Sequence, residues 1–204
     1  GEVVVCQGRT QSCLSTESFI YQAGQRGLAK EPVRLATQDA ADVLVGRVSD
    51  QPNPQVIFVN HSASRSLGRQ NIYLYTGGQD GFNPARRVEL PGNSAAEAIP
   101  CDFDQDGWPD ILVANDGEDE PYLNPPSYLY WGGPDGFDPE RRQEIPTVLA
   151  WGAAVGDIDR DGDLEIISGG TNDPSLRIFH LSQGRFDAQN FERVALYITS
   201  AEAK

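Results

Sequence analysis

The stretch Tyr73-Leu-Tyr-Thr-Gly-Gly-Gln-Asp-Gly-Phe82 returns 55 residues later (128 − 73) as Tyr128-Leu-Tyr-Trp-Gly-Gly-Pro-Asp-Gly-Phe137. The register continues beyond these stretches, because residues 83–91 match residues 138–146. One register kept over so many residues indicates an internal repeat. A period near 50 residues is typical of propellers and other repeat folds.

Weaker copies of the same unit flank the two strong ones. Residues 19–28 match 73–82 at an offset of 54 (73 − 19), and residues 40–49 line up with 95–104. Residues 176–181 and 186–187 match parts of 127–138 after a shorter connection. We therefore predict a single propeller domain or propeller segment over 1–204, with repeats at 1–36 (partial), 40–92, 95–147 and 149–198, and with 199–204 starting a further strand.

Each unit has the pattern of four short strands joined by turns. In the third repeat the strands are expected at 96–101, 110–114, 127–131 and 141–145. Residues 111–114 form a short apolar run, typical of a strand covered on both faces, and the Gly-Gly-Pro-Asp-Gly turn at 132–136 suits a hairpin. The 21 glycines and 14 prolines favour turns over long helices. The sequence thus predicts an all-β fold, a β-propeller of four-stranded antiparallel blades.

The number of blades stays open at this point. About four repeats are present, and the two ends of the chain could share one blade and close a small ring. The chain could equally be a segment of a larger propeller with about six to eight blades. Such a segment would be completed by further sequence or by association with another chain.

Two acidic loops recur at the 55-residue spacing. They read Asp102-x-Asp104-x-Asp106-Gly107-x-x-Asp110 and Asp157-x-Asp159-x-Asp161-Gly162-x-x-Glu165. Carboxylates at the first, third and fifth positions of a tight turn can converge on one hard cation, and the glycine permits the bend. The predicted ligands are the side chains of Asp102, Asp104, Asp106, Asp110, Asp157, Asp159, Asp161 and Glu165, with the backbone carbonyls of Trp108 and Asp163.

These loops predict Ca²⁺, about two ions per chain, in a structural role. Four like charges in so small a volume would repel one another without a cation; the rival interpretation is a generic acidic turn. A helix–loop–helix calcium site does not fit, because it needs flanking helices and a closing Glu at its twelfth position. In the preceding repeat no metal is predicted, since the ligand positions hold Arg47, Ser49, Gln51 and Gln55, and Pro52 replaces the glycine.

The acidic loops and the Tyr-x-Tyr-x-Gly-Gly-x-Asp-Gly-Phe element resemble the FG-GAP/VCBS family of repeats. Such repeats form calcium-loop blades in integrin α-chain propellers and in many secreted bacterial proteins. The resemblance covers about residues 15–200 and departs from the family pattern in the 47–55 loop and in the incomplete end repeats. It implies a β-propeller with Ca²⁺ in the loop between the first and second strands of a blade.

The charge of the chain excludes some partners. The 30 acidic and 16 basic residues give a formal net charge of −14. This argues against nucleic acid and against an anionic membrane, since both need basic patches. No run approaches the roughly 18 apolar residues that cross a bilayer, so no membrane insertion is expected. No signal-peptide pattern opens the chain, as expected of a mature or excised piece.

Two local features leave alternatives open. Cys6 and Cys13 could form a disulfide in an oxidising compartment, or all the cysteines could stay reduced. Asn60-His-Ser62 is an N-glycosylation sequon, although such triplets also arise by chance. Neither feature settles the compartment.

The histidines and tryptophans carry no predicted chemistry. Neither His61 nor His180 has a serine or cysteine nucleophile in a triad arrangement, so no catalytic or cofactor-binding residue is predicted. His180 is expected to pack or to lie at the surface. Trp131 and Trp151 are expected to pack between blades, whereas Trp108, inside an acidic loop, is the tryptophan most expected to be exposed.

These features favour a binding module over an enzyme. We expect an extracellular, secreted or cell-surface protein (the periplasm also fits), because weak calcium loops would stay empty in the cytosol. Adhesion, or binding of a protein or glycan, is expected on the face opposite the calcium loops, which carries residues 61–70, 91–95, 115–126 and 146–149. One alternative is the propeller of a polysaccharide lyase or another carbohydrate-active enzyme, which would need a cluster of bases that the sequence does not show. An architectural element of a filament or cell surface is another.

Overall fold

The computed structural model describes residues 2–9, 15–50, 52–62, 69–117, 124–170, 173–182 and 184–196. These residues form four antiparallel sheets of four strands each, which confirms the predicted all-β fold. The first sheet contains β1 (Glu2–Val5), β2 (Ser15–Gly24), β3 (Gly27–Leu28) and β4 (Val33–Gln38). The second contains β5 (Ala40–Gly46), β6 (Gln55–Asn60), β7 (Ile72–Thr76) and β8 (Arg87–Leu90). The third contains β9 (Ala95–Cys101), β10 (Asp110–Asn115), β11 (Ser127–Tyr130) and β12 (Arg142–Ile145). The fourth contains β13 (Ala150–Gly156), β14 (Glu165–Gly170), β15 (Ser175–Ser182) and β16 (Arg185–Ala195).

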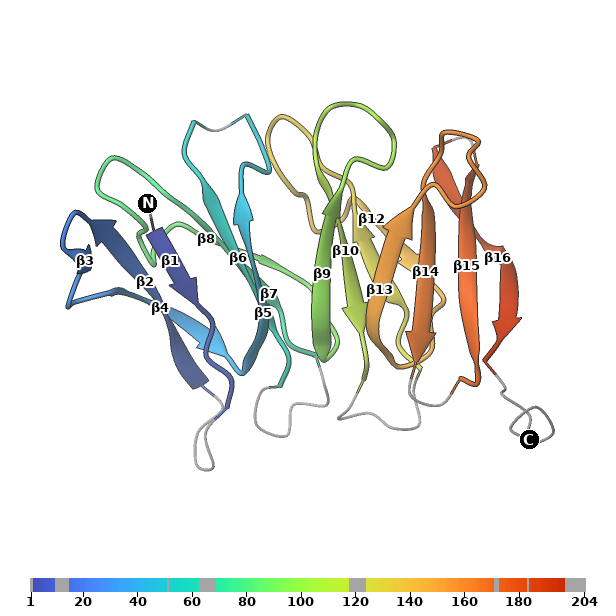
Figure 1. Ribbon diagram of the computed structural model, residues 1–204, viewed down its shortest axis with the longest axis horizontal. Helices are drawn as coiled ribbons and strands as arrows, with labels where there is room; N and C mark the ends of the chain where they lie inside the picture. Colours follow the sequence, from blue (N-terminus) through green and yellow to red (C-terminus); the bar gives the residue numbers. More distant parts are fainter. Residues whose placement is uncertain are drawn as a thin grey trace.

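The sheets stand side by side in the propeller-like arrangement predicted from the repeats (Figure 1). In the last three sheets the strands follow chain order, and their first strands β5, β9 and β13 contact one another from sheet to sheet. We call these three the inner strands. The first and fourth sheets stand at opposite ends, so the described residues form an open row of blades. The four strands expected in the third repeat are confirmed to within one residue at each end.

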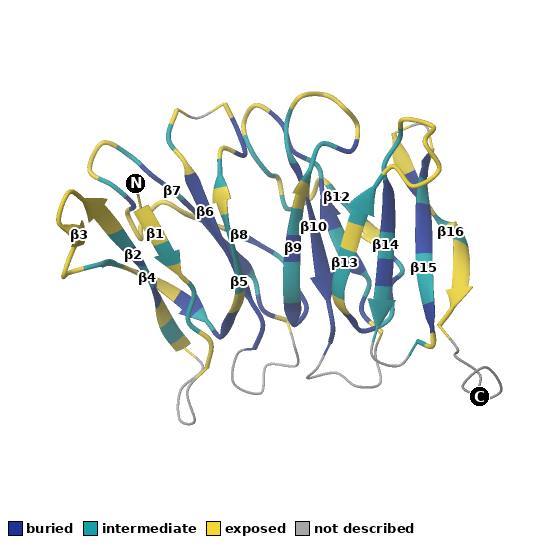
Figure 2. Cartoon of the chain, in the orientation of Figure 1, coloured by how far each residue is buried: buried dark blue, intermediate teal, exposed yellow. Residues whose placement is uncertain are grey.

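In the second and third sheets the second strand is the most deeply buried. Every residue of β6 and of β10 is buried, because neighbouring sheets cover these strands on both faces (Figure 2). Successive side chains of a strand point to opposite faces. Ile111 and Val113 therefore join a core shared with the second sheet, whereas Leu112 joins a core shared with the fourth.

Carboxylates on the inner strands tie each sheet to the next. Oδ2 of Asp42 on β5 accepts a hydrogen bond from the backbone N–H of Ala98 on β9 (3.2 Å). Oε2 of Glu97 on β9 accepts one from the N–H of Ala153 on β13 (3.1 Å). The equivalent position on β13, 55 residues after Glu97, is Gly152, and a Cβ there would lie 2.9 Å from the Glu97 carboxylate. We call the two hydrogen bonds the inter-blade tethers.

The backbone repeats the same register as the sequence. Asp39, Ser94 and Leu149, spaced by 55 residues, have positive φ values of 46°, 46° and 43° where each inner strand begins. Tyr75 and Tyr130, also 55 apart, each donate a hydrogen bond from the hydroxyl to a backbone carbonyl of the preceding repeat. Local conformation and packing thus recur together from blade to blade.

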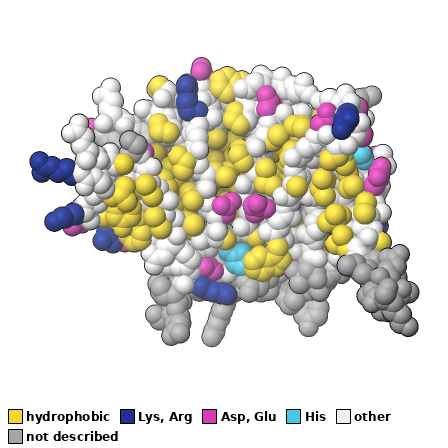
Figure 3. Space-filling view, viewed as in Figure 1, with side chains coloured by type: hydrophobic (Ala, Val, Ile, Leu, Met, Phe, Trp, Pro, Cys, Tyr) yellow, Lys and Arg dark blue, Asp and Glu magenta, His cyan; other side chains and the backbone are white. Residues whose placement is uncertain are grey.

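Hydrophobic side chains cover much of the side of the row that carries β1 and the inner strands (Figure 3). Val3, Val5, Val45 and Trp151 lie on these strands and are exposed. Among the described residues no helix is long and apolar enough to span a membrane.

The structure bears on the two local features that the sequence left open. Cys6 and Cys101 are free thiols, while Cys13 lies outside the described residues. Asn60 is fully buried, and its Nδ2 donates a hydrogen bond to the carbonyl of Asn71 (2.8 Å). The Asn60 amide is therefore inaccessible as a glycan acceptor in the folded chain. Residues 199–204, expected to start a further strand, also lie outside the described residues.

Candidate functional site

The two acidic loops lie together at one edge of the row. The first connects β9 to β10 and the second connects β13 to β14, at the same ends of neighbouring sheets (Figure 1). Nε2 of Gln105 in the first loop donates a hydrogen bond to the carbonyl of Gly162 in the second (3.0 Å). The loops are therefore in direct contact.

The first loop is a tight turn held by its own carboxylates. Gly107 has a φ of +91°, a conformation that glycine adopts without steric cost. The N–H of Gly107 donates to Oδ2 of Asp102 (3.0 Å), and the N–H of Trp108 donates to Oδ1 of Asp106 (2.8 Å). Short local hydrogen bonds of this kind fix the carboxylates relative to the backbone of the turn.

Asp110, the closing acid of the first loop, is buried with 1% of its surface exposed. Its Oδ2 accepts the N–H of Phe103 (2.8 Å), and its Oδ1 accepts the N–H of Gly132 in the β11–β12 turn (2.8 Å). Desolvation raises the Asp110 pKa from 3.8 to about 6; the two hydrogen bonds oppose this rise, and the charges of Asp104 and Asp106 add to it. A cation close to this carboxylate would favour its ionised form.

Two observations show that the first loop fits a hard cation. One oxygen each of Asp102, Asp104 and Asp110 lies within 4.8 Å of the others, and oxygens that share one Ca²⁺ at 2.3–2.6 Å are at most about 5 Å apart. Oδ1 of Asp102 is buried and has no hydrogen-bond partner among the described residues. A buried acceptor of this kind calls for a ligand. Asp106 lies in the same turn but outside this group of three.

The second loop repeats the arrangement with small differences. One oxygen each of Asp157, Asp159 and Asp161 lies within 4.8 Å of the others. Glu165, the closing acid, is 1% exposed, and its Oε2 accepts the N–H of Ile158 (2.9 Å). This hydrogen bond corresponds to the one from Phe103 to Asp110 in the first loop. Glu165 groups with Asp159 rather than with Asp157.

The two residues predicted to ligate through backbone carbonyls have equivalent surroundings. The N–H of Trp108 donates to Asp106, and the N–H of Asp163 donates to Oδ1 of Asp161 (2.9 Å). Both residues thus hold the turn in place. Ligation by their carbonyls stays a prediction.

His180 on β15 lies beside the second loop, which sequence reasoning missed. Its Nδ1 is 3.5 Å from Oε1 of Glu165 and 3.8 Å from Oδ2 of Asp159. The alignment of the repeats could have found it. His180 aligns with Trp131, and the next residue, Gly132, donates a hydrogen bond to Asp110, the closing acid of the first loop. The expectation that His180 only packs or lies at the surface was therefore incomplete.

Comparison with known families agrees with this geometry. The model of the FG-GAP-like repeat matches residues 102–168, the span that holds both acidic loops. Residues 102–168 are therefore similar to an FG-GAP-like repeat. No curated protein matches the chain.

In the second sheet the corresponding loop has a neutral closing residue. Gln55 has the place of Asp110; its Oε1 accepts the N–H of Val48 (3.0 Å) and its Nε2 donates to Oγ of Ser49 (3.0 Å). An amide with internal partners thus replaces the buried carboxylate.

At the edge opposite the acidic loops, a histidine meets a serine and an aspartate. Nδ1 of His61 is 2.9 Å from Oγ of Ser62, and Nε2 is 3.1 Å from Oδ2 of Asp116. The sequence did not predict this contact between His61 and Asp116, and the expectation that His61 is not catalytic stays a prediction. Ser62 and Asp116 are each only 2% exposed, so the hydroxyl is enclosed and the group joins two connections of the fold.

The exposed tryptophan is not the predicted one. Trp151 on β13 is 56% exposed, whereas Trp108 is half-buried, so both expectations are corrected. The Trp151 ring centroid lies 5.6 Å from that of His61, with 31° between the ring planes. Trp131 packs against the core between the third and fourth sheets, as expected.

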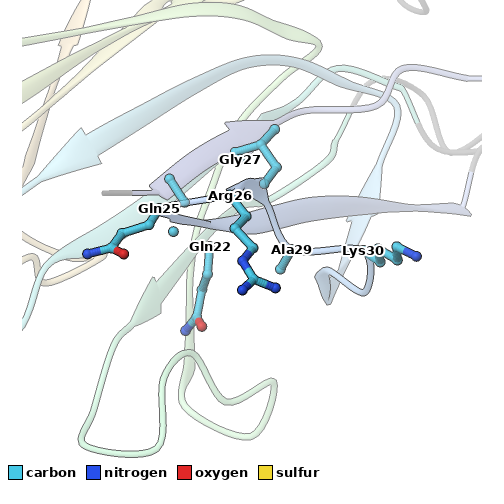
Figure 4. Close-up of a pocket in the computed structure, with 9 residues that line it drawn as sticks. Gln22, Gln25, Arg26, Gly27, Ala29 and Lys30 are labelled. Atoms are coloured by element: carbon cyan, nitrogen blue, oxygen red, sulfur yellow. The ribbon is translucent and has the colours of Figure 1, made fainter.

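A pocket on the first sheet is formed by the β2–β3 hairpin and the residues after it. Residues 22–30 line it, and Arg26 and Lys30 extend from the ribbon (Figure 4). Its lining contains no carboxylate, so it adds no acidic ligand to the acidic loops.

Another pocket lies next to the first acidic loop and gathers arginines. Arg141, Arg142 and Arg185 line it together with Trp131 and Asp104. Glu140 also lines this pocket, so three arginines and two acids meet there. Arg185 comes from the fourth sheet, and the sequence alone did not place it beside Arg141 and Arg142.

Proposed function

We propose that the chain is a calcium-binding β-propeller module that recognises a protein or glycan, with calcium in a structural role. The observation that carries the proposal is the convergence of three carboxylates in each loop, together with a buried closing acid in each. Calcium prefers six to eight oxygen ligands in forgiving geometry, which carboxylate-rich turns supply.

Each loop would hold one ion at the junction of two strands. The ligands proposed are Asp102, Asp104, Asp106, Asp110 and the Trp108 carbonyl in the first loop, and Asp157, Asp159, Asp161, Glu165 and the Asp163 carbonyl in the second. The ion would neutralise the mutual repulsion of the carboxylates and hold the adjoining strand ends together. No bond is made or broken, so this calcium has no catalytic part.

We place the module outside the cell, where calcium is abundant enough to fill weak sites. The partner would bind at the edge opposite the acidic loops. The exposed Trp151 supports this, since an aromatic ring with an apolar body and a polar N–H is favoured at interfaces. The net charge of −14 makes nucleic acid an unfavourable partner.

One observation favours an alternative function. The pocket of Arg141, Arg142 and Arg185 offers the basic anchors that an enzyme acting on acidic polysaccharides would need. An assay for new unsaturated ends on such polysaccharides separates a lyase from a binding module. An architectural role would instead appear as filaments of the purified protein under the microscope.

Calcium stoichiometry tests the main proposal. Equilibrium binding should find about two ions per chain, and Asp104→Ala or Asp159→Ala should each remove one of them, because each variant takes a ligand from a single loop. Asp135→Ala removes an exposed acid from a neighbouring turn and serves as the matched control with two ions. Two ions retained in the Asp104→Ala, Asp159→Ala double variant would overturn the assignment.

The pKa of Asp110 predicts a pH dependence for the first site. Because the folded-state pKa is raised to about 6, the buried ionised carboxylate destabilises the calcium-free fold above pH 6, and this penalty is lost as the pH falls through 6. Below pH 6 calcium must displace a proton, so its affinity for this loop should fall about tenfold per pH unit. Calorimetry between pH 7 and 5 measures this change. The first loop of the Asp110→Asn variant should bind calcium weakly, and its affinity should not change near pH 6.

A further inference from the structure

The two acidic loops match in sequence but differ in one neighbouring side chain. Tyr130 pairs with Ile111 in the third sheet, and Phe179 pairs with Ile166 in the fourth. The residue that follows each aromatic is therefore equivalent in the two blades. It is Trp131 beside the first loop and His180 beside the second.

Among the described residues, His180 sits between carboxylates without a hydrogen bond from either ring nitrogen. Nδ1 lies 3.5 Å from Glu165 and 3.8 Å from Asp159. Nε2 is buried without a hydrogen-bond partner, and Oε1 of Glu192 lies 3.3 Å away at an angle unsuited to a hydrogen bond. An imidazole in this position is available to a ligand on its Nδ1 side.

The closing acids also differ in what they bind. Both oxygens of Asp110 accept a backbone N–H, the second from Gly132. Glu165 is equally buried, yet only its Oε2 has such a donor among the described residues. Its Oε1 faces His180 instead. A carboxylate 99% buried thus directs an oxygen without a hydrogen bond at the imidazole.

These distances suit a small ion that accepts nitrogen. Ligand atoms about 2.1 Å from one ion lie about 3.0 Å apart at right angles, about 3.4 Å apart at tetrahedral angles and at most about 4.2 Å apart. The Nδ1 separations of 3.5 and 3.8 Å fall in this range. Imidazole with carboxylate suits zinc and similar transition metals, whereas calcium prefers oxygen alone.

We propose that Asp159, Glu165 and Nδ1 of His180 form a mixed nitrogen and oxygen site for a divalent transition ion, Zn²⁺ foremost. This inference rests on the proposed function only in taking the second loop to be a cation site. Asp159 and Glu165 are shared, so zinc and calcium compete for this loop. The first loop has Trp131 in place of the histidine and keeps its preference for calcium.

The test titrates Zn²⁺ alone, followed by calorimetry, into tag-free protein with and without saturating calcium. One zinc ion should bind to the calcium-free chain and should displace one of the two calcium ions. His180→Gln should weaken zinc binding at least tenfold and leave two calcium ions bound. Equal zinc affinity in wild type and His180→Gln would overturn the inference.

A measurement on the wild-type protein removes any dependence on the folding of the variant. Nitrogen NMR of the two imidazoles should show a zinc-induced shift of Nδ1 in His180, with His61 as an unshifted internal reference. A shift of His61 alone, or none, would contradict the site. If two calcium ions bind but zinc neither binds nor displaces calcium, the zinc inference alone is refuted. If zinc binds through His180 but no calcium binds, only the proposed function is refuted.

Discussion

Removal of calcium with a chelator is expected to lower the melting temperature by about 5–10 °C per site, starting from free calcium at about 100 times the dissociation constant. A ligand that binds only the folded state stabilises it by about 2.7 kcal/mol at that ratio. For a chain of this size, each kcal/mol shifts the melting temperature by about 2–4 °C. The physical reason is that each ion offsets the repulsion among four carboxylates at a strand junction.

Circular dichroism melting in calcium and in chelator measures this shift. The Asp104→Ala, Asp159→Ala double variant should melt at one temperature in both buffers, whereas the Asp135→Ala control should behave as wild type. Magnesium at equal concentration should restore less of the shift, since it demands stricter geometry and dehydrates reluctantly. Identical wild-type curves in both buffers would show that the loops are not calcium sites.

Gly132→Ala is expected to destabilise the fold by about 3 kcal/mol, as overpacking does where backbone must move. A Cβ at Gly132 would lie 2.2 Å from the carbonyl oxygen of Pro109. The clash pushes the β11–β12 turn away from the first acidic loop, so the N–H of Gly132 loses Asp110. Calcium binding at this loop should weaken along with the melting temperature, which should fall by about 6–12 °C.

Two matched glycines in the chain separate this close approach from a general cost of alanine. Gly77 has the same place in the second sheet, where a Cβ would lie 3.1 Å from the carbonyl of Pro54. At Gly133 the nearest atom is the flexible end of Arg141, at 3.3 Å. Gly77→Ala and Gly133→Ala should therefore cost much less than Gly132→Ala. Similar melting temperatures for all three variants would contradict the argument.

Most of the fold followed from the repeat, because a period fixes many strands at once. The apolar run at 111–114 had to be covered on both faces, and β10 is buried throughout. In an up-and-down sheet the first and third connections share one edge, so the first acidic loop lies beside the Gly-Gly turn, and the N–H of Gly132 donates to Asp110. Local pattern and global packing agree in these places.

What the sequence could not predict depends on contacts between blades. His61 and Asp116 are 55 residues apart and meet only because neighbouring sheets stack in register. The exposure of Trp151 depends on which strands face the open side of the row. The pocket beside the first loop combines Arg141 and Arg142, at the start of β12, with Arg185 of the next sheet. Periodicity within one chain carries no direct signal for such pairs.

The inter-blade tethers give the row a direction. Asp42 and Glu97 each reach toward the sheet that comes later in the chain, while Gly152 has no side chain to extend onward. A further blade that docks on the fourth sheet would have to be held without this hydrogen bond. That outer junction is therefore expected to separate first. The two tethered junctions, between the second and third sheets and between the third and fourth sheets, should separate later. The outer junction is thus where the assembly is expected to open or to exchange partners.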